Sequence, residues 1–239
     1  MDRTQATRQT IDPKTTLSLI GMFVVVWALW DTPLVYPIKI FVVCLHELGH
    51  AAAALLTGGE VVSIQVFPDQ GGLTTARGGL PFVILSAGYT GSVLAGGALL
   101  YLSSYRRWGR VLMTALAALI ALSTLLFFRN VFGIVYGLGI AGAMLLSASR
   151  LSEAVNYYVL RFVAVASCLY ALLDIRSDLF VLQAADLSAN GVITDAMALE
   201  RLTNIPALFW AIVWMVISIV MLFRFLNLSA RAGDPVDSS

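Results

Sequence analysis

Long apolar runs separated by short polar segments make up most of this chain. Seven runs have the length and character of helices that cross or enter a bilayer, whose hydrocarbon core needs about 20 consecutive apolar residues. They cover residues 17–30, 38–57, 80–102, 111–128, 131–147, 162–182 and 207–225. The pattern predicts an all-α polytopic membrane protein with about seven transmembrane helices.

One segment breaks this helical pattern, directly after the second apolar run. Val62, Ile64 and Val66 alternate with polar residues, which is typical of a strand that is buried on one face. Residues 68–72 have the composition of a turn, and residues 73–77 can return as a second strand. The alternation favours a small β-hairpin over a plain interhelical loop, which is the alternative.

Polar segments flank the apolar part of the chain and interrupt it near its end. We expect a polar N-terminal segment over residues 1–15, a membrane-embedded domain over residues 16–226 and a polar tail over residues 227–239. The loop over residues 184–205 contains a short helix, because Thr194 or Asp195 can cap a helix that runs to Arg201.

Composition supports the membrane assignment and excludes several other classes of protein. Of the 239 residues, 59% are hydrophobic and 12% are charged, whereas soluble domains average about 25% charged residues. The formal net charge is +1, so no basic face indicates nucleic acid as a partner. Both cysteines, Cys44 and Cys168, lie in apolar runs, which argues against a disulfide framework.

Candidate chemistry is concentrated in the second apolar run, which contains His46-Glu47-Leu48-Gly49-His50 and thereby both histidines of the chain. Residues four apart share a helical face, so both imidazoles can bind one metal ion. Glu47 lies beside them, where a carboxylate can act as a general base on water. The alternative is a chance match in which the imidazoles bond only to the backbone or to tyrosine. Ionisable groups in a membrane span are costly, which favours the metal site.

A catalytic zinc site usually has three protein ligands, so a carboxylate or cysteine must join the two histidines. Asp174 is the best candidate, because it lies at a similar depth along its own apolar run. Asp178 is one helical turn further on and shares its face. Asp195 is a weaker candidate, since helix capping explains it. Asp174 and Asp178 can alternatively form an ion pair with an arginine.

Small residues recur at a spacing of four in the third apolar run, at Gly88, Ser92 and Gly96. This small-xxx-small pattern allows two membrane helices to approach closely. Close packing against the histidine helix would hold the site rigid.

The motif indicates hydrolysis by a metal-activated water. Glu47 would accept a proton from water and pass it to the leaving amine. Asn130 can stabilise an oxyanion if it faces the cavity, although Arg129-Asn130 is better explained as a turn. An exposed strand edge over residues 61–67 can hold an extended substrate by strand addition.

The residues around this motif resemble the site-2 protease family, in a compact branch without a PDZ domain. The resemblance rests on the His-Glu-Leu-Gly-His motif with Ala51 to Ala54, on Gly58-Gly59, on the hairpin and on the stretch over residues 86–92. It implies a membrane zinc metallopeptidase with His46 and His50 as ligands and Glu47 as catalytic base. It also implies an aspartate from a later helix as third ligand, where Leu173-Asp174 matches the start of the family's Leu-Asp-Gly motif.

The sequence thus predicts an integral, multi-pass membrane protein that acts as a zinc-dependent intramembrane peptidase on membrane-spanning substrates. The site is expected to hold Zn²⁺ on His46, His50 and Asp174 with Glu47 as the base. The expected partners are a membrane protein substrate and the lipid bilayer, and no nucleic acid. The alternatives are a non-catalytic membrane scaffold that retains a zinc site and a metal transporter, which would need several ligand clusters along a path.

Overall fold

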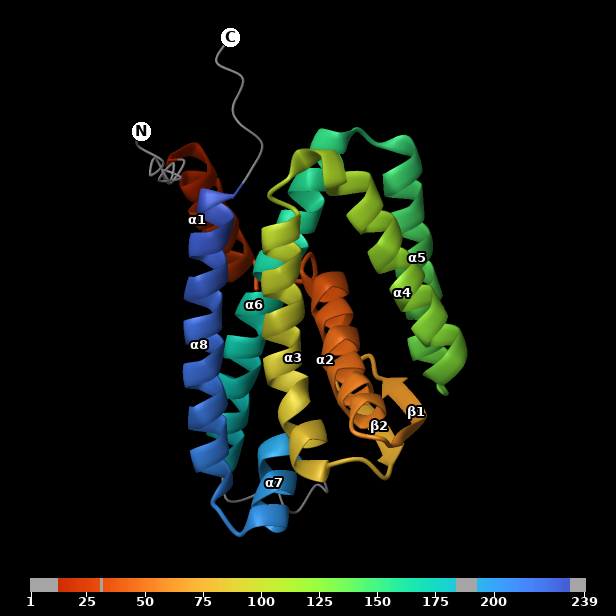
Figure 1. Cartoon of the computed structure of the whole chain (residues 1–239), viewed down its shortest axis with the longest axis vertical. Coiled ribbons are helices and arrows are strands. Elements are labelled where there is room, and N and C mark those ends of the chain that lie inside the picture. Colours follow the sequence, from red (N-terminus) through yellow and green to blue (C-terminus); the bar gives the residue numbers. More distant parts are fainter. Residues whose placement is uncertain (1–12, 31, 184–192, 233–239) are drawn as a thin grey trace, which may run out of the picture.

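The computed structural model describes residues 13–30, 32–183 and 193–232, without the side chains of residues 13–15 and 176–183. The described residues form a helical bundle with one β-hairpin (Figure 1). Its elements are α1 (Pro13–Ala28), α2 (Tyr36–Leu56), β1 (Glu60–Val66), β2 (Gly72–Arg77), α3 (Pro81–Leu102), the 3₁₀ turn η1 (Arg106–Trp108), α4 (Gly109–Phe127), α5 (Val131–Arg150), α6 (Glu153–Gln183), α7 (Asp195–Thr203) and α8 (Ala207–Arg231).

Six of these helices are long and apolar enough to cross a membrane, and the chain is a multi-pass membrane protein. They are α2, α3, α4 with η1, α5, α6 and α8. The seventh apolar helix, α1, has 16 residues and is shorter than a full span. The predicted class of fold is therefore confirmed, with one short helix among the apolar ones.

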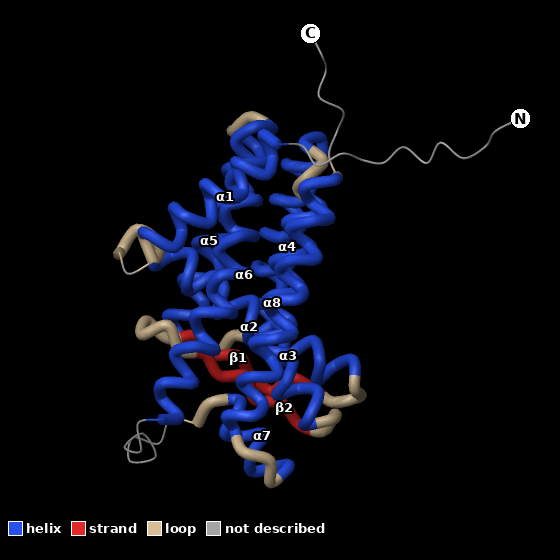
Figure 2. The backbone as a smooth tube through the Cα atoms, turned by 90° about the vertical axis from the view of Figure 1, so that its left-hand side faces the viewer, coloured by secondary structure: helices blue, strands red, loops and turns tan. Residues whose placement is uncertain are grey.

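Helix α3 lies between α2 on one side and α6 and α8 on the other, while α4 and α5 form an adjacent antiparallel pair (Figures 1 and 2). Small residues allow the close approach of α2 and α3, as the spacing predicts. A Cβ atom on Gly49 of α2 would lie 3.2 Å from the carbonyl carbon of Ala87 on α3. One on Gly96 would lie 2.9 Å from Cβ of Ser167 on α6.

The predicted hairpin follows α2, with β1 and β2 antiparallel and Ile64 opposite Thr74. The loop between α4 and α5 fixes the other edge of β1. The backbone N–H of Arg129 donates to the carbonyl of Ile64 over 3.0 Å, and the Asn130 amide donates to the carbonyl of Val66 over 2.6 Å. The sequence predicts an exposed edge over residues 61–67, but this loop occupies that edge at Ile64 and Val66.

Helix α6 begins at Glu153, nine residues before the predicted span over residues 162–182, because the polar residues between them do not fit an apolar run. The structure buries the guanidinium of Arg161 among hydroxyl groups instead. Its Nη1 and Nη2 donate to Oγ of Ser104 and Ser229 over 3.2 and 3.1 Å, and its Cζ lies 5.2 Å from the centroid of the Tyr157 ring. A charge with such partners can remain inside a membrane helix, so hydropathy alone placed the boundary too late.

The short helix predicted before the last span is α7, and the first residue of α8 is tied to it. Thr194 is the N-cap of α7 and accepts a hydrogen bond from the backbone N–H of Met197 over 3.3 Å. Its Glu200 side chain accepts from the backbone N–H of Ala207 over 3.1 Å. The sequence also predicts a turn at Asn190-Gly191 in this loop, and these two residues lie outside the described part of the chain. These bonds fix α7 across the end of the bundle where α2 ends and α3 begins (Figure 1).

Candidate metal centre

Two imidazoles from successive turns of α2 converge, as the spacing of the motif requires. The Nε2 atoms of His46 and His50 lie 3.0 Å apart. The Nδ1 atom of His50 lies 2.6 Å from the carbonyl oxygen of Ile84 on α3, to which Nδ1–H donates. A backbone carbonyl that takes the Nδ1 proton orients the ring and leaves Nε2 to face the partner atoms.

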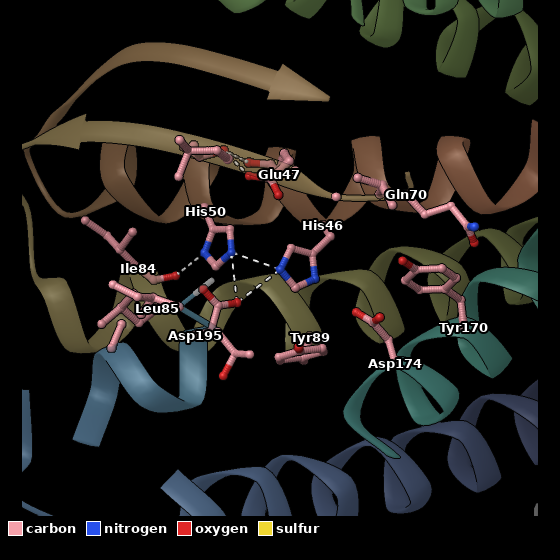
Figure 3. Close-up of a pocket in the computed structure, with 18 residues that line it drawn as sticks. His46, Glu47, His50, Gln70, Ile84, Leu85, Tyr89, Tyr170, Asp174 and Asp195 are labelled. Carbon is pink, nitrogen blue, oxygen red and sulfur yellow. Dashed lines mark hydrogen bonds and ion pairs between the residues drawn. The ribbon is translucent and has the colours of Figure 1, made fainter. Parts of the chain in front are cut away.

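The third group at this point is Asp195, the first residue of α7 (Figure 3). Its Oδ2 atom lies 3.1 Å from Nε2 of both His46 and His50. Burial alone would raise the pKa of Asp195, but the charge of His50 and hydrogen bonds to both imidazoles lower it well below its usual range. The ionised carboxylate that these contacts favour is the form that binds metal.

These three groups fit a zinc ion in donor chemistry and in spacing. Two imidazole nitrogens and a carboxylate oxygen meet at one point, and such acceptors converge only around a cation, whether a proton or a metal. Ligands at 2.0–2.1 Å from a tetrahedral centre lie about 3.3 Å apart. The separations of 3.0–3.1 Å among Nε2 of His46, Nε2 of His50 and Oδ2 of Asp195 are close to that value.

The absence of a side chain at Gly88 leaves room for this cluster. A Cβ atom on Gly88 would lie 2.6 Å from Nε2 of His50 and closer still to Nε2 of His46. Atoms at such distances overlap, so any larger residue would displace both imidazoles. The small-residue spacing of α3 therefore serves the site as well as the packing of the helices.

Glu47 lies next to the cluster but is held by a separate set of contacts. Its Oε2 atom accepts a hydrogen bond from the Thr74 hydroxyl of β2 over 2.6 Å, and its side chain is buried. A Cβ atom on Gly72 would overlap the Glu47 carboxylate, because it would lie 2.7 Å from Cδ of Glu47. The hairpin thus fixes this carboxylate beside the imidazoles without making it part of the metal cluster.

A cavity of about 380 Å³ contains both the cluster and Glu47. Its walls come from α2, the hairpin, α3, α6 and α7 (Figure 3). Tyr89 of α3 packs edge-on against His46 with ring centroids 4.8 Å apart, and its other neighbour is the ring of Trp214 at 5.3 Å. The Tyr89 ring, supported by Trp214, restricts the orientation of His46.

Asp174 also lines this cavity, on the side nearest to Tyr170 (Figure 3). Among the described residues, the donor atoms that cluster around one point belong to His46, His50 and Asp195, and Asp174 is not one of this group. Its assignment as a metal ligand therefore stays a prediction. The side chain of Asp178 lies outside the described part of the chain.

Two further residues considered from the sequence are placed away from the cavity. The Asn130 amide is occupied by the backbone of Val66, with which it exchanges two hydrogen bonds, so Arg129-Asn130 forms the turn that was favoured. Cys44 is a free, buried thiol and is not among the described residues that line the cavity.

Asp195 is the residue of this cluster that sequence reasoning ranked too low. Capping was taken to explain it, but Thr194 performs the capping and leaves the Asp195 carboxylate free to face the imidazoles. The sequence contained a signal for this. Thr194 and Asp195 are both suited to cap the helix, and since one cap is enough, the other residue is available for a different role.

Comparison with known proteins agrees with this geometry. The model of the family described as Peptidase M50B-like matches residues 19–225, which include every described residue of the metal centre. No curated protein and no solved structure gives a match to the chain.

Proposed function

Because the chain belongs to the Peptidase M50B-like family, we propose that it is a zinc-dependent intramembrane peptidase that hydrolyses peptide bonds of membrane-spanning substrates. The observation that supports this most directly is the convergence of His46, His50 and Asp195 beside Glu47, inside a cavity of a multi-pass helical protein. We assign Asp195 as the third ligand, because its carboxylate touches both imidazoles.

When bound, zinc supplies a Lewis acid that makes water more acidic and polarises the scissile carbonyl. Glu47 accepts the proton of the attacking water and delivers it to the leaving amine nitrogen. The Thr74 hydroxyl holds one Glu47 oxygen at 2.6 Å, so the carboxylate is oriented before substrate arrives. Preorganisation of this kind lowers the barrier, because the base does not have to be ordered during the reaction.

The substrate backbone has a place to bind along β2. The outer edge of β1 contacts the loop between α4 and α5, whereas β2 has no described strand partner other than β1. Gly72, Leu73 and Thr74 of β2 also line the metal cavity. A peptide added to β2 as a third strand would therefore be extended beside Glu47, the conformation that peptide hydrolysis requires.

A non-catalytic scaffold that retains a zinc site is the competing function. Such a protein needs the three ligands but has no use for a buried carboxylate beside them. Here Glu47 is buried, receives a hydrogen bond from Thr74 and fits against Gly72, where a side chain would collide with it. This arrangement favours catalysis over binding alone.

The variant Glu47→Gln tests the proposal, because glutamine keeps the shape of the side chain and loses its basicity. The variant is expected to retain about one zinc per chain and to lose at least about 100-fold in cleavage of a co-expressed single-span membrane substrate. The matched control is Glu60→Gln, which removes an exposed carboxylate of the same hairpin that pairs with Arg77. Undiminished cleavage by Glu47→Gln, or no cleavage by the unmodified protein on any tested substrate, would refute the proposal.

A further inference from the structure

A second, polar cavity adjoins the metal cavity at the turn of the hairpin. It has a volume of about 270 Å³ and is lined by Trp30, Asp69, Gln70, Tyr170, Leu173 and Asp174. Gln70, Tyr170 and Asp174 line the metal cavity too, so the two spaces share a wall. Because a water molecule takes about 30 Å³ in the liquid, this volume is large enough for part of a substrate side chain.

The wall of this second cavity combines two carboxyl groups with aromatic surface. Asp69 and Asp174 contribute carboxylates, and none of its described lining residues is lysine, arginine or histidine. The rings of Trp30 and Tyr170 lie side by side with centroids 5.7 Å apart. Carboxylates together with aromatic faces are the combination that attracts an ammonium or guanidinium group.

One neighbouring cation shows that this aromatic surface accepts positive charge. The Nζ atom of Lys39 lies 4.7 Å from the centroid of the Trp30 ring. Lys39 is not among the described residues that line the cavity, so it does not fill the space between Asp69 and Asp174.

The hairpin places the second cavity in line with the path of a substrate. Gly72, Leu73 and Thr74 of β2 pass the metal cavity, and Asp69 and Gln70 lie in the turn immediately before β2. A peptide paired along β2 would therefore run from the metal centre to the second cavity. Since side chains on one face of a strand recur every two residues, one of them would enter this cavity a few positions from the scissile bond.

The turn that carries Asp69 and Gln70 is held in a fixed conformation. The Asp69 carboxylate accepts a hydrogen bond from the backbone N–H of Gly71 over 3.2 Å, and the Tyr36 hydroxyl of α2 donates to the carbonyl of Pro68 over 2.8 Å. Gln70 adopts a left-handed backbone with φ of 70°, which is uncommon for a residue with a side chain. Such strain persists where the surrounding structure enforces it, and it concentrates at functional sites.

From this placement we infer that the second cavity is the specificity subsite for a lysine or arginine side chain of the peptide substrate, near the scissile bond. The inference rests on the proposed peptidase function and adds the chemistry that the enzyme selects. An acidic side chain would be repelled by Asp69 and Asp174. An apolar one would offer no hydrogen bond to either carboxyl group.

The test measures preference rather than activity alone, with the zinc-loaded full-length protein in detergent. The scissile bond is first mapped by mass spectrometry on a cleaved single-span substrate. Lysine or methionine is then placed at each of the four positions on either side of that bond. At each position, kcat/KM of the lysine substrate is compared with kcat/KM of the methionine substrate. We expect one position at which lysine exceeds methionine by about tenfold.

Variants of the acidic wall assign that preference to the cavity. In Asp69→Asn and Asp174→Asn the ratio of kcat/KM for lysine over methionine is expected to fall towards one. In Asp69→Lys the preference is expected to change to glutamate at the same position. Glu60→Gln, which removes a carboxylate from the hairpin outside the cavity, is expected to keep the wild-type ratio.

The outcomes separate this inference from the proposed function. Cleavage without a lysine preference at any position, or a preference that survives all three variants, overturns the cation subsite and leaves the peptidase standing. Absence of any cleavage by the wild-type protein overturns both. Zinc content is measured for each variant, and if Asp174→Asn loses zinc, the two Asp69 variants decide the matter.

Discussion

Replacement of Gly88 by alanine is expected to weaken zinc binding at least about 100-fold, the upper end of what changes around a metal site usually cause. The added Cβ atom would lie 2.6 Å from Nε2 of His50, whereas ordinary contact begins at 3.4 Å. The ring would therefore have to retreat by about 0.8 Å. Ligand distances in metal sites hold to about 0.2 Å, so the displaced nitrogen could no longer bind together with the other donors.

The assay is the zinc content of the purified protein after equilibration with a series of buffered free zinc concentrations. Two neighbouring glycines of α3 provide matched controls. Gly91→Ala brings its Cβ atom 3.3 Å from Cα of Gly49, a contact that small shifts can absorb. Gly96→Ala would place its Cβ atom 2.9 Å from Cβ of Ser167 on α6. This clash lies far along α3 from the imidazoles.

Gly91→Ala should bind zinc like the wild-type protein. Gly96→Ala should lower the midpoint of thermal unfolding in detergent while keeping the zinc stoichiometry. If Gly88→Ala binds zinc with wild-type affinity, the metal does not lie between His46 and His50 as the geometry requires. If Gly96→Ala loses zinc equally, the effect of Gly88→Ala reflects the packing of α3 and not the site.

Three more outcomes follow from the contacts of the site. Asp195→Ala should lose zinc, whereas Asp174→Ala should retain it, as measured by elemental analysis. Removal of zinc by a chelator should increase amide hydrogen exchange in α7 selectively, because the metal bridges this helix to α2. Gly72→Ala should keep zinc but reduce cleavage by about 10- to 100-fold, because a displacement of roughly 1 Å in a reacting group has an effect of that size.

Each of these outcomes has a result that contradicts it. Zinc lost from Asp174→Ala and kept by Asp195→Ala would exchange the roles of the two aspartates. Unchanged exchange in α7 after chelation would show that Asp195 is not a ligand. Wild-type cleavage by Gly72→Ala would mean that the position of the Glu47 carboxylate does not limit the reaction.

Features that depend on neighbouring residues could be predicted from the sequence. The two histidines meet because residues four apart share a helical face, whatever the rest of the fold does. The hairpin follows from the alternation of Val62, Ile64 and Val66, which matches a period of two. Both signals lie within a few residues, and the structure confirms both.

The approach of Asp195 to the two imidazoles could not be predicted in the same way, because His46 and Asp195 lie 149 positions apart along the chain. The prediction of Asp174 compared only depth along two helices. Depth is one of the three coordinates that define the position of a side chain. It placed Asp174 in the correct cavity but could not tell which side of the cavity it would face. Asp195 reaches the imidazoles through the packing of α7 on α3 and α8, which no local pattern encodes.

The start of α6 was missed for a related reason. Hydropathy counts Arg161 as a polar residue, but two of its guanidinium nitrogens donate to Ser104, in the turn after α3, and to Ser229 of α8. Partners from distant parts of the chain change the environment of a side chain, and a sliding window along one helix does not include them.

The distance along the chain between the donors has a consequence for biosynthesis. A ribosome completes α2, with both histidines and Glu47, long before it reaches Asp195, so a nascent chain in the membrane contains only two of the three groups of this cluster. A metal site on these three groups can therefore be completed only after α7 has been synthesised and packed against α2.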